Sequence, residues 1–129
     1  MTYRDIFDSA LRMICEQNVD GDVSDYEERA TYLLATFCRQ CAKLDAKYRA
    51  AYNLTGGGKV SSAACIGLDA EFPLSEALSP SACYYLSAML TLDENEDMSE
   101  QFFSLYTDAL ASLSASLPAK SGPIVNRYS

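Results

Sequence analysis

The fold of this chain is decided by residues 72–113, FPLSEALSPSACYYLSAMLTLDENEDMSEQFFSLYTDALASL. They predict a helix with Ser79 as its N-cap and Pro80 at the first helical position, where a missing N–H costs no hydrogen bond. This helix is apolar nearly all round, so it should be buried. After an acidic turn at 93–97, apolar residues recur every three or four positions, which predicts an amphipathic helix. We expect Leu86 and Phe102 to be core positions of this helical pair.

The rest of the chain predicts two more helices, so that the four lie near residues 3–17, 25–52, 80–93 and 97–117. Three consecutive glycines interrupt the chain after the second helix, because each costs roughly 1 kcal/mol relative to Ala in a helix. We therefore predict an all-α fold, a compact bundle of four main helices. It has a long glycine-containing loop between the second and third helices and an extended C-terminal tail. At this length residues 1–118 form a single helical domain and residues 119–129 a C-terminal arm. Four apolar residues should hold the end of the long loop against the core: Leu68, Phe72, Leu74 and Leu78.

Composition limits the classes of function. The 129 residues include 10 Lys and Arg against 18 Asp and Glu, for a net charge of −8. This balance argues against sequence-specific nucleic-acid binding, which needs clustered cations for phosphate contacts. No run approaches the ~20 apolar residues that cross a membrane. Five cysteines without a signal peptide indicate reduced thiols in a cytosolic setting.

The residue types that carry most catalytic and metal chemistry are missing or badly placed. Histidine, the commonest general base and a frequent zinc ligand, is absent. Cys38 and Cys41 have ligand spacing but lie in mid-helix, which favours buried small hydrophobic residues over a metal or redox site. The GGGK sequence at 56–59 is followed by Val60 rather than the Ser or Thr of a phosphate loop. Residues 18–22 faintly resemble a calcium loop but lack its final Glu. We expect no enzymatic activity, no metal and no cofactor.

Residues 72–113 resemble the head–tail connector proteins of tailed bacteriophages. Members of that group typically show a proline, a helix rich in Tyr, Leu and Ala, an Asp/Glu turn, and a Y-x-x-x-L-x-x-L helix. Here the last motif is Tyr106, Leu110 and Leu113. The resemblance implies a virion structural protein of a phage or prophage, assembled in the cytoplasm of the bacterial host. It would form a ring of about twelve copies at the head–tail junction, between the portal and the tail or neck proteins. The alternative is an acidic helical protein-interaction or regulatory module of bacterial origin without enzymatic activity.

Several segments are candidate contacts with such partners. A basic stripe at four-residue steps along the second helix is either an ordinary exposed face or an edge that meets an acidic neighbour, such as residues 93–100 of another copy. Residues 53–67 and 119–129 combine apolar side chains with glycine or proline, which suits contact arms that order on binding. Tyr84 and Tyr85 face different sides of their helix, so one of them is available to a partner unless both are packed in the core. The candidate interface residues are Arg39, Lys43, Lys47, Leu54, Lys59, Val60, Tyr84, Ile124, Val125 and Tyr128.

Overall fold

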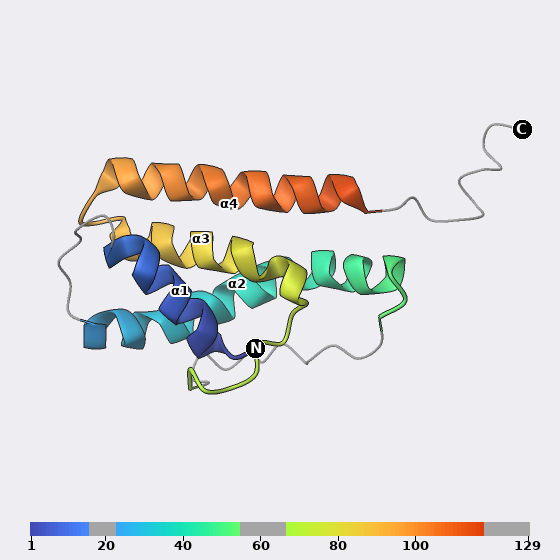
Figure 1. Ribbon diagram of the computed structural model, residues 1–129, viewed down its shortest axis with the longest axis horizontal. Coiled ribbons are helices and arrows are strands. Elements are labelled where there is room, and N and C mark those ends of the chain that lie inside the picture. The colour runs from blue at the N-terminus through green and yellow to red at the C-terminus, as the bar shows by residue number, and fades with distance from the viewer. Residues whose placement is uncertain (16–22, 55–66, 118–129) are drawn as a thin grey trace, which may run out of the picture.

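Four α-helices make up most of the fold (Figure 1). The computed structural model describes residues 1–15, 23–54 and 67–117. The predicted all-α bundle is confirmed, and each helix bound lies within two residues of its predicted position. In the described residues the only β pairing is an isolated bridge between Thr2 and Glu71. The elements are α1 (Tyr3–Cys15), α2 (Val23–Ala51), the 3₁₀ turn η1 (Glu76–Leu78), α3 (Ser79–Thr91) and α4 (Glu96–Ser116).

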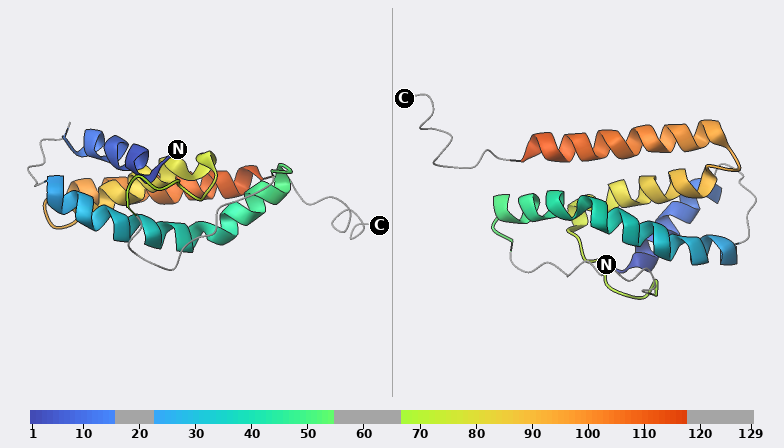
Figure 2. Two further views of the ribbon diagram at one scale, coloured as in Figure 1. Left: turned by 90° about the horizontal axis from the view of Figure 1, so that it is seen from below. Right: turned by 180° about the vertical axis from the view of Figure 1, so that it is seen from behind.

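The central helix is α3, which packs against each of the other three. In Figures 1 and 2, α4 runs antiparallel to α3 on one side, while α1 and α2 cover the opposite side. Most of α3 is buried, including Leu86 and Leu90, as its apolar sequence predicts. The domain is therefore layered, with α4 outermost, α3 in the middle, and α1 and α2 below.

An aromatic cluster joins the layers. The Phe37 ring of α2 lies 5.7 Å from the Tyr85 ring of α3 and 6.1 Å from the Tyr106 ring of α4. It also contacts Phe72, whose ring meets that of Tyr3 edge to face at 5.9 Å. Such pairs add roughly 0.5–1.5 kcal/mol each beyond the apolar area that they bury. The cluster therefore ties all four helices and the segment before η1 into one core.

The segment before α3 is fastened to the start of the chain by backbone hydrogen bonds. The amide of Arg4 donates to the carbonyl of Leu68 at 2.7 Å, and the amide of Phe72 donates to the carbonyl of Met1 at 2.9 Å. The predicted apolar anchors of this segment are confirmed, since all four are buried: Leu68, Phe72, Leu74 and Leu78.

Two details of the predicted helical pair were wrong. The N-cap of α3 is Leu78, not Ser79, because η1 continues directly into the helix. The leucine side chain has no acceptor and makes no capping bond. Phe102 is only half-buried, whereas Leu86 is fully buried. The reason is that residues 1–15, 23–54 and 67–117 cover α4 on one side only, and Met98 and Ser99 are the buried residues of this helix.

Candidate protein-interaction surfaces

The predicted basic stripe lies on the exposed face of α2. Arg39, Lys43 and Lys47 are all exposed, and among the residues the structure describes neither lysine has an ion-pair partner. A nearby cation, Arg49, is not part of this surface. Its Nε donates to the Asp45 carboxylate at 2.9 Å, and its side chain is largely covered.

A buried carboxylate fixes the opposite side of the same helix. Asp45 is only 6% exposed, and its Oδ1 accepts hydrogen bonds from the amide and the hydroxyl of Ser75, at 2.8 and 2.6 Å. Three donors, counting Arg49, therefore compensate the desolvation of this charge. Sequence reasoning missed the site, although Asp45 follows Cys41 by four residues and so lies on the core face of α2.

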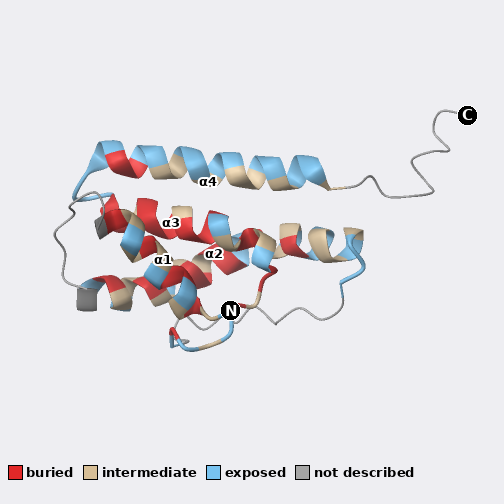
Figure 3. Cartoon of the chain, viewed as in Figure 1, coloured by how far each residue is buried: buried red, intermediate tan, exposed pale blue. Residues whose placement is uncertain are grey.

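The second surface is the outward face of α4, which is exposed along the whole helix (Figure 3). It is acidic at Asp97, Glu100 and Asp108, and the helix contains no Lys or Arg. Leu105 is 45% exposed beside these acids. A helix with an uncovered face of this length can accept another protein without rearrangement of the core.

The inner side of α4 is held by a few specific contacts. The Asn95 side chain caps the helix by accepting from the Met98 amide at 3.0 Å. The Ser99 hydroxyl donates to the Ala88 carbonyl of α3 at 2.7 Å. Ring contacts of Tyr106 complete the attachment. These contacts fix the direction in which the outward face points.

The acidic turn before α4 is attached to the first turns of α2. The Tyr26 hydroxyl donates to the Glu94 carboxylate, and burial, followed by this bond, raises the pKa of Tyr26. Arg29 donates to the Met89 carbonyl at 3.2 Å. With its 1.5 Å rise per residue, α2 places Lys43 about 25 Å beyond Tyr26. The acidic turn and the basic stripe are thus held well apart.

The other candidate interface residues are placed as follows. Leu54, just after α2, is 46% exposed. Tyr84 is half-buried while Tyr85 is buried in the aromatic cluster, so the two side chains do occupy different environments. Five of the candidates lie outside the described residues: Lys59, Val60, Ile124, Val125 and Tyr128.

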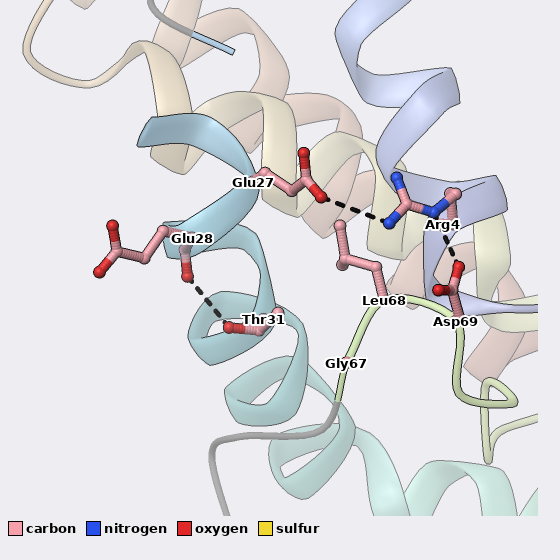
Figure 4. A pocket seen from close by; sticks show the side chains of 7 residues that line it. All are labelled: Arg4, Glu27, Glu28, Thr31, Gly67, Leu68 and Asp69. Atoms are coloured by element: carbon pink, nitrogen blue, oxygen red, sulfur yellow. Dashed lines mark hydrogen bonds and ion pairs between the residues drawn. The ribbon is translucent and has the colours of Figure 1, made fainter. Parts of the chain in front are cut away.

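An open depression not predicted from the sequence lies between α1, α2 and residues 67–69 (Figure 4). Arg4 lies at its edge, with Nε 2.9 Å from Asp69 and an Nη 3.3 Å from Glu27. These ion pairs are exposed, so each contributes little to stability. Its one cation is already shared by two carboxylates and Glu28 adds a third acid, so the depression offers no free positive charge to a ligand.

The described cysteines behave as buried apolar residues, as predicted. Cys38, Cys41 and Cys83 are free and buried. Burial raises the pKa of both Cys38 and Cys41 to about 11, so these thiols stay protonated and unreactive near neutral pH. Within residues 1–15, 23–54 and 67–117, no group of three or more His, Cys, Asp or Glu could hold a metal ion.

Comparisons with family models, curated proteins and solved structures find no match. In the part of the chain that the structure describes, no helix is both long and apolar enough to span a membrane. The basic stripe of α2 and the outward face of α4 are the candidate contact surfaces.

Proposed function

We propose that this protein is a non-enzymatic structural component of the head–tail junction of a tailed bacteriophage or prophage. Copies of it form a ring between the portal and the tail or neck proteins. The observation that carries the proposal is the fold of residues 72–113, the stretch that resembles the connector family. It consists of buried α3, an acidic turn and antiparallel α4, in the order that the resemblance implies.

The uncovered surface of α4 also supports an assembly role. Only two of its 21 residues are buried, and its exposed side includes the large apolar residue Leu105. Exposed apolar side chains with polar surroundings are typical of surfaces that meet another protein. A structural protein that works only in an assembly would carry such a surface.

The charge of the chain fits a ring through which DNA passes. A net charge of −8 disfavours tight contact with phosphates. An acidic ring would let the genome slide instead of holding it.

The test is deletion of the gene from the phage or prophage genome that encodes this protein. Heads that have packaged DNA cannot join tails without a connector, so we expect DNA-filled heads and separate tails in the lysate, counted by electron microscopy. A plasmid copy of the wild-type gene should restore tailed particles. Tailed, infectious particles at wild-type numbers would contradict the proposal and would favour the interaction or regulatory module.

A further inference from the structure

We infer that the outward face of α4 in one copy docks on the basic stripe of α2 in a second copy, joining the molecules head to tail. This inference deepens the proposed function and rests on it, because it names the surfaces that join neighbours in the ring. Its starting point is that none of the residues that the structure describes covers the outward side of α4.

Charge complementarity identifies the occupant of this face as a copy of the same chain. Residues 92–117 contain six Asp and Glu and no Lys or Arg. The outward face of α2 presents Arg39, Lys43 and Lys47, and the one acid in that stretch, Asp45, is turned inward and bonded to Arg49 and Ser75. Each molecule therefore carries both members of an oppositely charged pair.

The two faces cannot meet within one molecule. The two helices meet through their inner sides, where the Phe37 ring of α2 lies 6.1 Å from the Tyr106 ring of α4, so their outward faces point away from each other. The acidic turn contacts Tyr26, about 25 Å along α2 from Lys43. That distance exceeds the Debye length of about 8 Å at physiological ionic strength, so the acidic turn and Lys43 hardly interact in the monomer. Their attraction is available only between copies.

Apolar or small residues flank the charges on both faces. Leu105 lies beside the acids, and two small exposed residues, Ala46 and Ala50, lie beside the lysines. The apolar side chain can therefore approach the α2 backbone closely.

The contact joins two different faces, so it is heterologous. Every copy then offers one free face of each kind, and the assembly grows until a rotation closes it into a ring. Because its charged groups are exposed, the contact should weaken as salt screens them.

The test uses two double variants, K43E/K47E and E100K/D108K, in sedimentation velocity at low and high salt. All four positions are exposed, so thermal melts should match the wild type. Wild-type protein should form salt-sensitive oligomers. Each double variant alone should lose association at least about tenfold, since like charges then face each other. An equimolar mixture should regain it, because each variant supplies the face that the other lacks.

The matched control is D8K/E76K, which changes the net charge as much as E100K/D108K does but at exposed positions on α1 and η1. It should associate like the wild type. In parallel, carbodiimide coupling of wild-type protein should join Lys43 or Lys47 to Asp97, Glu100 or Asp108, as identified by mass spectrometry. Cross-links found in the oligomer fraction and not in the monomer fraction are intermolecular.

Three results would overturn the inference: a mixture that fails to associate, oligomers whose cross-links map to other surfaces, or wild-type protein that stays monomeric up to about 1 mM, the effective concentration that neighbours reach in an assembly. None of these results would contradict the proposed function. The proposed function is contradicted by a different result, namely tailed particles that form after deletion of the gene.

Discussion

At the scale of single residues, the buried carboxylate of Asp45 joins α2 to the segment before α3. Replacing it with Ala leaves the Ser75 amide and the Arg49 guanidinium without their acceptor. We expect D45A to lower the free energy of unfolding by about 3 kcal/mol, as for other broken buried charge networks. Urea unfolding measures this loss. The exposed neighbour variant K47A is the control and should stay within about 0.5 kcal/mol of the wild type.

The buried thiols and phenols make stability depend on alkaline pH. Burial raises the pKa of Cys38 and Cys41 from about 9 to about 11, and that of Tyr106 to about 12. Above pH 9 the unfolded chain loses protons that the folded chain keeps, so the unfolded state is favoured. The melting temperature should be constant from pH 7 to 8.5 and fall between pH 9 and 11. In the variant C41A the fall should be smaller; an equal fall would show that this thiol is not responsible.

Leu86 and Phe102 show what the sequence could and could not predict about the core. Both lie in apolar patterns with helical spacing, yet only Leu86 is fully buried. L86A should cost roughly 2–5 kcal/mol because it leaves a cavity. F102A should cost clearly less, because part of that ring is already in contact with water. Equal losses in urea unfolding would mean that α4 is covered more completely than its exposure indicates.

At the scale of elements, all four helices and nearly all their bounds were predictable, because periodicity and turn residues act locally. The start of α3 was not predictable in this way, because η1 runs directly into the helix and Ser79 is therefore not the N-cap. Periodicity did indicate the covered side of α4, because Met98, Tyr106 and Leu110 of its apolar pattern lie on that side. It could not show which elements pack there, since that depends on where the other helices lie. The Asp45 network was missed for the same reason: its partner Ser75 is 30 residues away.

The end of α4 gives a prediction about the C-terminal arm. The helix ends at Ser116, and the Leu117 amide closes it by donating to the Ser114 carbonyl. Deleting residues 119–129 removes none of the contacts described above, so the thermal melt should be nearly unchanged. If these residues are the contact arm that the sequence predicts, the truncated protein should be absent from purified virions, as measured by mass spectrometry. If the truncated protein is incorporated normally, or no longer folds, the prediction that residues 119–129 are a contact arm is wrong.

At the scale of the whole molecule, the layered fold separates charges of opposite sign onto opposite sides. The sequence predicted the basic stripe and the acidic segment as parts of a possible contact, but not their separation. That separation follows from the inner sides of α2 and α4 meeting at the Phe37–Tyr106 ring contact, which turns their outward faces away from each other, and from the Tyr26–Glu94 bond at the far end of α2. A molecule with this distribution favours head-to-tail association over symmetric pairing.

The most direct test of the account is electron cryo-microscopy of the head–tail junction in virions of the phage that encodes this protein. We predict a ring of this four-helix fold between the portal and the tail, with α4 of each copy against α2 of its neighbour. A junction built entirely from other proteins would contradict the account.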